Sequence, residues 1–130
     1  MSRVRILLAD DHSGFMNRVE ELLDFAFEIV GKVKNGETLV AAALQLHPEV
    51  IVTDISMPIL NGIDAALKLR QLGSRAKIIF LTVHSDRDFV LACSEAGATG
   101  YVLKSRLVND LIPALRESLA GRMFLSQNTN

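Results

Sequence analysis

Hydrophobic positions along the chain alternate between short continuous runs and runs with helical spacing. The segment Val50 to Val52 has three β-branched residues with no polar alternation, which is typical of a parallel strand covered on both faces. Similar short runs, rich in Val, Ile, Leu and Phe, predict five strands at residues 4–9, 28–33, 50–54, 77–82 and 99–103. The strands are separated by stretches in which apolar residues recur three or four positions apart, as on one face of a helix.

The helical spacing predicts five helices, one after each strand. The first four run over about residues 15–26, 39–46, 62–72 and 86–96. Because Pro113 is tolerated only in the first turn of a helix, the last helix is predicted to begin near Asn109 or Asp110, and Gly121 ends it. In the fourth helix, Phe89, Val90 and Leu91 are consecutive and cannot all be buried on one face, so one of them is expected near the surface.

Five strand–helix pairs within residues 1–121 predict one α/β domain, a doubly wound five-stranded parallel sheet with helices on both faces. Residues 122–130 turn polar without periodicity and are interpreted as a linker or C-terminal tail. The length of 130 residues and the hydrophobic fraction of 49% fit a single domain with its own core.

Composition excludes several classes of partner. The 14 basic and 15 acidic residues give a net charge of -1 and no basic patch, which argues against direct binding to nucleic acid or anionic membranes. The longest apolar run, Leu39 to Leu44, is too short to span a membrane. A single cysteine, Cys93, excludes an intrachain disulfide, fits a reducing cytoplasm and is interpreted as a packing residue. The sequence thus predicts a cytoplasmic protein.

The segment from Val50 to Gly62 delivers one carboxylate to the end of a buried strand. Asp54 stands where the strand must stop, because Pro58 cannot donate to a ladder and Asn61-Gly62 supplies a turn before the next helix. Polar side chains end or follow the other strands as well. In a parallel sheet these positions meet at one edge, where ligands bind, so the following five residues are expected to converge: Asp10, Asp11, Asp54, Thr82 and Lys104.

The chemistry of this group points to a metal and a phosphoryl group. Three carboxylates held together repel one another unless a cation neutralises them, and oxygen ligands with exchangeable waters suit Mg²⁺. Lys104 and Thr82 would complete an anion pocket beside the metal. Asp54 is then both a metal ligand and a possible nucleophile. Any one of the five residues could merely end a strand, but five at one edge favour a functional site.

Four motifs resemble the receiver domain of two-component response regulators, a CheY-like fold with strand order 2-1-3-4-5. They are Leu8 to His12, Thr53 to Pro58 with Asn61-Gly62, Leu81-Thr82, and Gly100 to Lys104. The resemblance covers residues 3–121. The pieces Leu81 to His84 and Gly97 to Ser105 are most similar to the NarL/LuxR-type branch, in which a helix-turn-helix domain usually follows. No such domain is present in this chain.

The resemblance implies a role for each residue of the site. Asp54 would take a phosphoryl group from a sensor histidine kinase. Asp11, Asp54 and the backbone carbonyl of Ser56 would bind Mg²⁺ directly, with Asp10 acting through water. Lys104 would offset charge on the phosphoryl oxygens.

The resemblance also implies a switch. Thr82 would bond the new phosphoryl oxygen and leave space for Tyr101 to rotate from exposed to buried. His84 and Ser56 would tune dephosphorylation. The output would be transcription through the absent DNA-binding domain, with a homodimer as a further possible partner.

The sequence allows alternatives to a transcriptional receiver. The chain would be a switch rather than an enzyme, apart from self-dephosphorylation. A stand-alone response regulator is the nearest alternative. An aspartyl-phosphate hydrolase is less favoured, because it would need a carboxylate two residues after the nucleophile, where this chain has Ser56. The histidines His12, His47 and His84 are far apart in the sequence, which argues against a zinc site.

Overall fold

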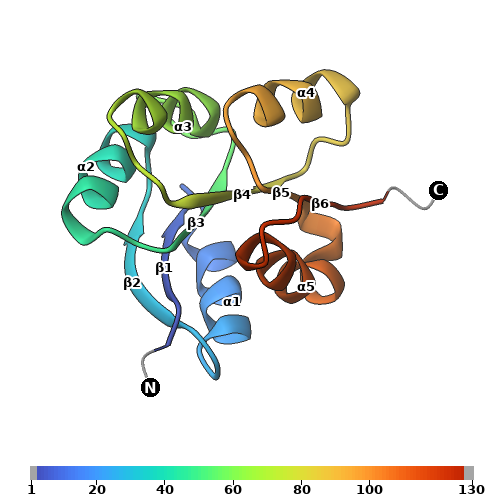
Figure 1. The fold of residues 1–130 in the computed structure, drawn as a ribbon. Coiled ribbons are helices and arrows are strands. Elements are labelled where there is room, and N and C mark those ends of the chain that lie inside the picture. Colours follow the sequence, from blue (N-terminus) through green and yellow to red (C-terminus); the bar gives the residue numbers. More distant parts are fainter. Residues whose placement is uncertain (1–2, 128–130) are drawn as a thin grey trace.

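One parallel sheet with helices on both faces makes up residues 3–127, the part of the chain that the computed structural model describes (Figure 1). The strands are β1 (Arg5–Ala9), β2 (Glu28–Val33), β3 (Val50–Asp54), β4 (Lys77–Thr82), β5 (Gly100–Leu103) and β6 (Phe124–Leu125). The helices are α1 (Ser13–Leu23), α2 (Gly36–Leu46), α3 (Gly62–Gln71), α4 (Arg87–Glu95) and α5 (Leu107–Leu119), and a 3₁₀ turn, η1 (Lys104–Arg106), precedes the last of them.

The strand order is β2-β1-β3-β4-β5-β6, and every neighbouring pair is parallel. Helices α2, α3 and α4 cover one face, and α1 and α5 cover the other (Figure 1). Each face of the sheet has its own hydrophobic core. Ile51 of β3 packs into the core under α2, α3 and α4, and the next residue, Val52, packs into the core under α1 and α5. Burial on both faces explains the unbroken apolar runs. The doubly wound CheY-like fold is therefore confirmed.

The loop that follows β3 folds back tightly against the end of the strand. A Cβ atom on Gly62 would lie 2.0 Å from the carbonyl oxygen of Asp54, so only glycine fits there. The Gly62 N–H donates to the carbonyl of Ile55 at 2.8 Å. Asn61 accepts from the N–H of Asp64 at 2.8 Å and so caps α3. These contacts fix the path of the chain on leaving Asp54.

The structure adds a sixth strand inside the segment that was interpreted as a linker or tail. The Phe124 N–H donates to the Thr99 carbonyl at 3.2 Å, and the Ser126 N–H donates to the Tyr101 carbonyl at 2.8 Å. Strand β6 thereby extends the sheet along β5. Two paired residues are too few to give a periodic pattern, so the sequence did not reveal them. Residues 128–130 of the predicted tail lie outside the described residues.

The predicted start of the last helix was wrong. Helix α5 begins at Leu107, which places Pro113 inside it rather than in its first turn. Leu107 is buried, and Arg106 pairs with Asp110 one turn later at 2.8 Å. Burial of Leu107 and this ion pair favour the early start. The cost is that the carbonyl of Asn109 lacks the N–H that an ordinary residue at position 113 would donate.

Helix α4 confirms the prediction about its three consecutive apolar residues, because Leu91 is 50% exposed. Cys93 on the same helix is fully buried, and burial raises the pKa of its thiol to about 12. Cys93 is therefore a packing residue.

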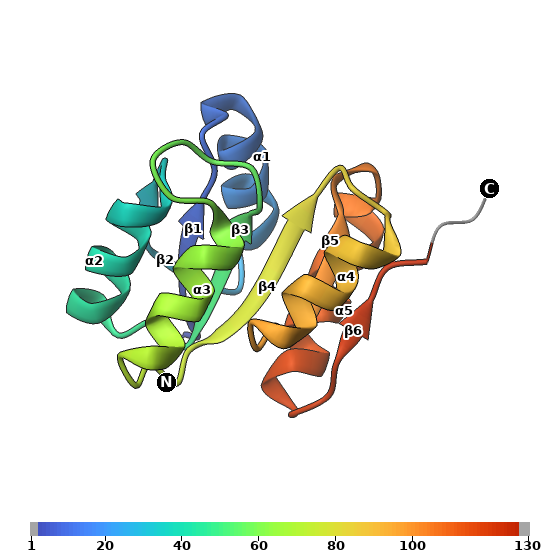
Figure 2. The same ribbon diagram turned by 90° about the horizontal axis from the view of Figure 1, so that it is seen from above.

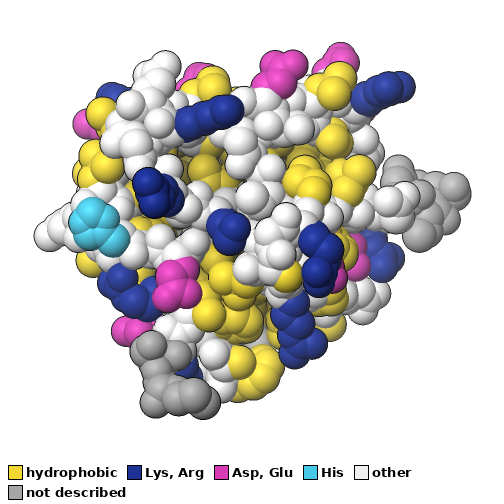
Figure 3. Space-filling view, in the orientation of Figure 1, with side chains coloured by type: hydrophobic (Ala, Val, Ile, Leu, Met, Phe, Trp, Pro, Cys, Tyr) yellow, Lys and Arg dark blue, Asp and Glu magenta, His cyan; other side chains and the backbone are white. Residues whose placement is uncertain are grey.

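The face of the molecule drawn in Figure 3 carries Lys and Arg side chains interspersed with Asp and Glu. No helix within residues 3–127 has the length and apolar character needed to cross a membrane.

Candidate functional site

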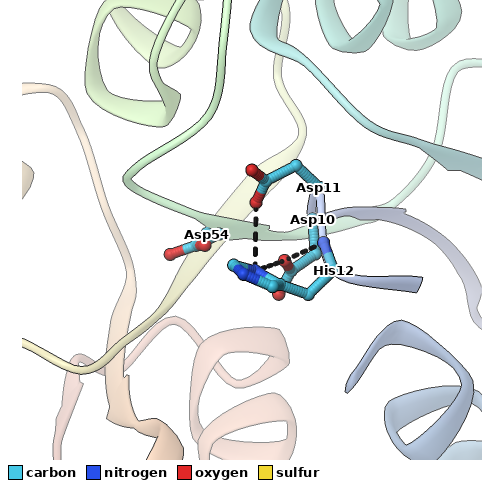
Figure 4. A group of neighbouring side chains, drawn as sticks. All are labelled: Asp10, Asp11, His12 and Asp54. Carbon is cyan, nitrogen blue, oxygen red and sulfur yellow. Dashed lines mark hydrogen bonds and ion pairs between the residues drawn. The ribbon is translucent and has the colours of Figure 1, made fainter. Parts of the chain in front are cut away.

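Four side chains with metal-binding atoms gather at the carboxyl edge of the sheet. Asp10, Asp11 and His12 follow β1, and Asp54 ends β3; one ligand atom from each lies within 4.8 Å of the others (Figure 4). The loops after β1, β3, β4 and β5 reach the same edge (Figure 2). The parallel sheet thus brings together carboxylates that are more than forty positions apart in the sequence.

Lys104 enters the same cluster from the end of β5. Its ammonium donates to the carboxylate of Asp10 at 2.9 Å and to that of Asp54 at 3.3 Å. The lysine side chain is only 13% exposed. Such a buried ammonium between two carboxylates is a strong local source of positive charge. Three predicted site residues are therefore in direct contact.

The charges in this cluster are only partly balanced. Burial raises the pKa of the Asp54 carboxyl, Lys104 lowers it, and the Asp10 carboxylate raises it again, so that the pKa lies above the usual value. For Lys104, burial lowers the pKa, but the hydrogen bond to Asp10 and the charges of both carboxylates raise it above its ordinary value. Asp54 therefore carries its negative charge at a cost that a further cation would relieve.

The donor set fits a hard divalent cation. Carboxylate oxygens of Asp10, Asp11 and Asp54 are the ligands that Mg²⁺ prefers. Asp11 is partly exposed, with 34% of its side chain accessible, so the cluster stays open to solvent. A metal with several retained waters can reach such a site.

Thr82 and Tyr101 converge on the main chain of His84. The fully buried hydroxyl of Thr82 accepts a hydrogen bond from the His84 N–H at 3.1 Å. The Tyr101 hydroxyl donates to the His84 carbonyl at 2.5 Å. Burial raises the pKa of the Tyr101 phenol to about 12, which keeps it a hydrogen-bond donor. Both predicted switch residues thus engage the loop between β4 and α4.

Two further predicted residues, His84 and Ser56, follow the strands β4 and β3 that end at the site. The His84 ring stacks on Phe89 of α4, with 4.1 Å between ring centroids. Ser56 is exposed on the loop after β3. The predicted metal contact of its carbonyl and its role in dephosphorylation stay predictions.

Sequence reasoning missed two residues of the site. The ring nitrogen Nδ1 of His12 lies 3.1 Å from Asp11 and 3.3 Å from Asp10, although 71% of this side chain is exposed. Its place directly after Asp11 was the available signal. Phe15 is the first residue of the helix predicted over residues 15–26; it packs against the core, and its ring also lies under the Lys104 ammonium, 4.4 Å from Nζ to the ring centroid.

Comparison with known proteins gives a family for this arrangement. Residues 6–116 match the model of the response regulator receiver domain. The nitrate/nitrite response regulator protein NarL of Escherichia coli K12 is 36% identical over 124 residues, which cover 94% of this chain and 57% of NarL. The transcriptional regulatory protein DegU of Brevibacillus brevis is 32% identical over 126 residues, or 95% of this chain and 53% of DegU. The chain spans just over half the length of both relatives.

Solved structures agree with this result. A two-component response regulator of the LuxR family from Aurantimonas sp. SI85-9A1 superposes with a TM-score of 0.91 at 31% identity, covering 96% of this chain and 91% of that one. The response regulator domain of Thermotoga maritima CheB superposes with a TM-score of 0.82 at 24% identity, covering 91% and 97% of the two chains. At this lower identity, the comparison with CheB shows the fold alone.

Proposed function

The chain belongs to the response regulator receiver domain family, in its NarL/LuxR-type branch, and we propose that Asp54 accepts a phosphoryl group from a sensor histidine kinase. The placement of Asp54 carries the proposal. Its carboxylate ends β3 at the carboxyl edge, 3.3 Å from the Lys104 ammonium and beside two other carboxylates. Strand-end carboxylates in such surroundings can form acyl phosphates.

The proposed step is an in-line transfer. An oxygen of the Asp54 carboxylate attacks phosphorus, the bond from phosphorus to the donor's imidazole nitrogen breaks, and the electron pair of that bond stays on the imidazole. Lys104 stands where it can offset the charge on the transferred oxygens. Mg²⁺, held by Asp10, Asp11, Asp54 and the Ser56 carbonyl, supplies further positive charge when bound.

The signal then passes through the loop after β4. A phosphoryl oxygen on Asp54 would accept a hydrogen bond from the Thr82 hydroxyl, whose oxygen in this structure accepts from the His84 N–H. Tyr101 bonds to the carbonyl of the same residue, so movement of the loop and rotation of the tyrosine are coupled. Tyr101 is buried here, and its exposed alternative belongs to the proposal. A covalent charge thereby biases a two-state element.

His84 and Ser56 are proposed to set the lifetime of the acyl phosphate. Each lies two positions after a central residue of the site, Thr82 and Asp54 respectively. Stacking of His84 on Phe89 holds its ring beside α4, from where it would limit the access of water. The domain would thus act as a phosphoacceptor switch, with self-dephosphorylation as its only further activity.

The output is proposed to be transcription. DegU is named as a transcriptional regulatory protein and extends well beyond the part matched by this chain. We place a helix-turn-helix domain after the receiver, outside this chain. The face formed by α4, β5 and α5, where Leu91 is exposed, would contact that domain or a second copy.

Labelling with a small phosphodonor tests the assignment. Incubation with acetyl phosphate and Mg²⁺ should add one phosphoryl group to the wild type and none to Asp54→Asn, as measured by intact mass. Asp88→Asn is a matched control, because this aspartate is exposed in the first turn of α4 and is not one of the clustered carboxylates. An undiminished adduct on Asp54→Asn would refute the assignment.

Removal of one carboxylate tests the metal site. Asp11→Asn should weaken Mg²⁺ binding by about tenfold or more, because loss of a supporting ligand group has effects of that size. Thermal melts across a Mg²⁺ titration measure the affinity through the stabilisation that a ligand of the folded state provides. Asp88→Asn again serves as the control. Equal Mg²⁺ dependence of Asp11→Asn and the wild type would exclude Asp11 from the site.

A further inference from the structure

The Lys104 ammonium has a third neighbour besides its two carboxylates. The ring of Phe15 lies 4.4 Å from Nζ, measured to its centroid, within the range of a cation–π interaction. An ammonium has three N–H groups, and Asp10 and Asp54 accept two of them. The aromatic face can therefore stabilise the side of the ammonium that the carboxylates leave open.

The position of Phe15 follows from the start of α1. It is the third residue of that helix, which begins shortly after Asp10 and Asp11. Side chains of a helix lean toward its N-terminus, so this ring covers the carboxyl edge rather than the middle of the sheet. Met16 and Val19 fill the core beneath α1 and are buried, whereas Phe15 is only half-buried. Its ring thus serves the edge of the site as much as the core.

A lysine side chain that nothing holds in place is mobile, and this mobility would slow the proposed phosphoryl transfer. Lysine has several rotatable bonds and loses much conformational freedom when it is held in one place. The phosphoryl group can be stabilised only in molecules whose ammonium is already beside Asp54. The labelling rate therefore scales with the fraction of molecules in which Lys104 is in place.

We propose that Phe15 is a positioning residue that holds the Lys104 ammonium over the Asp54 carboxylate through the face of its ring. The proposal rests on the proposed phosphoacceptor function and adds a residue to that same site. Arg18 is the competing cation, since its guanidinium carbon lies 5.8 Å from the centroid of the same ring. Arg18 is exposed and contacts none of the carboxylates at hydrogen-bond distance among residues 3–127.

Stepwise fluorination of Phe15 tests the proposal. Fluorine withdraws charge from the ring face and barely changes its shape, so packing is retained while the attraction for a cation weakens. The rate of labelling by acetyl phosphate should fall progressively with each added fluorine, by roughly threefold across the series. Phe15→Tyr keeps an electron-rich ring face and should retain the rate, whereas Phe15→Leu should lose as much as the fully fluorinated ring.

Two controls separate this role from packing. The same fluorination at Phe25, which is 68% exposed, should leave the rate unchanged. The series at Phe15 should keep its slope in an Arg18→Gln background if Lys104 is the cation concerned. A flat series, or a slope that disappears with Arg18→Gln, would overturn the proposal. Failure of the wild type to become labelled would instead refute the phosphoacceptor function itself.

Discussion

Ile59 has a backbone conformation that β-branched residues rarely adopt. Its φ angle is 72°, in the left-handed region, and the residue is 75% exposed. The Leu60 N–H donates to the Pro58 carbonyl at 2.8 Å across this residue, which closes a tight turn. Because Ile59 is mostly exposed, burial of its own side chain does little to offset this strain. The turn is instead needed to bring the chain from Asp54 back to Asn61 and Gly62.

Replacing Ile59 should therefore stabilise the protein. Asn tolerates the left-handed region, so Ile59→Asn is expected to raise the free energy of unfolding by about 1 kcal/mol. Ile59→Val keeps the β-branch and the strain, and it should leave stability unchanged. Urea unfolding followed by circular dichroism measures both. A loss of stability in Ile59→Asn would show that the exposed isoleucine has a stabilising contact.

Residues of the site differ in how far the sequence could predict them. Convergence of Asp10, Asp54 and Lys104 was predictable, because each stands at the end of a parallel strand and these strand ends meet at one edge of the sheet. The position of Phe15 beside Lys104 was not predictable. Helical spacing places a residue on the buried side of a helix, but it does not show whether the side chain covers the core or a charged edge. His12 follows Asp11, but its orientation depends on loop geometry.

At the scale of elements, a buried polar cluster joins α5 to β6. The Ser126 hydroxyl donates to Asp110 at 2.6 Å and accepts from the Leu103 N–H at 3.1 Å. Burial raises the pKa of the Asp110 carboxyl, but hydrogen bonds from Arg106 and Ser126 bring it below its usual value. This cluster also links the end of β5 to the start of α5. It anchors a strand that is too short to hold by its ladder alone.

Ser126→Ala should test the importance of that anchor. Loss of the hydroxyl leaves a buried N–H and a buried carboxylate each short of a partner, so the free energy of unfolding is expected to fall by about 1 to 2 kcal/mol. Ser85→Ala is the matched control, since this serine is exposed close to the same strands. Urea unfolding of the two variants gives the comparison. Equal stability would mean that the Ser126 hydroxyl does not anchor β6.

Hydrophobic periodicity predicted the first five strands and five helices, because burial of one or both faces leaves a pattern that long elements repeat. Hydrophobic periodicity failed where polar contacts determine whether an element forms or where it begins. Strand β6 depends on Ser126 and Asp110, and the early start of α5 depends on Arg106 together with Leu107. Such contacts join residues that no local pattern relates. The presence of Pro113 also favoured a later start than tertiary packing allows.

At the scale of the whole molecule, the sheet concentrates charge at one edge and makes stability depend on pH. The pKa of Asp54 is raised in the folded state, chiefly by burial. The folded protein therefore binds more protons than the unfolded chain between the two pKa values, and this group lowers stability as pH rises through that window. Below the unfolded value of about 4, the effect is absent. The raised pKa of Lys104 adds stability that is fully present below the unfolded value and is lost only as the pH rises through the folded pKa, in the alkaline range.

Asp54→Asn should consequently be more stable than the wild type at pH 7 in the presence of a chelator. The gain should shrink as the pH falls toward 4, because Asp54 of the wild type then becomes protonated, and position 54 is uncharged in both proteins. Thermal melts at a series of pH values measure the difference. A gain that does not vary with pH would show that the charge of Asp54 is not its cause.

The most direct test of Asp54 as the phosphoacceptor is to identify the carboxylate that carries the phosphoryl group. Borohydride reduces an acyl phosphate of aspartate to homoserine, which marks the position permanently for peptide mass mapping. After treatment with acetyl phosphate and Mg²⁺, homoserine should be found at position 54 and at no other aspartate of the chain. Homoserine at position 10 or 11, with Asp54 unchanged, would contradict the assignment of Asp54 as the phosphoacceptor.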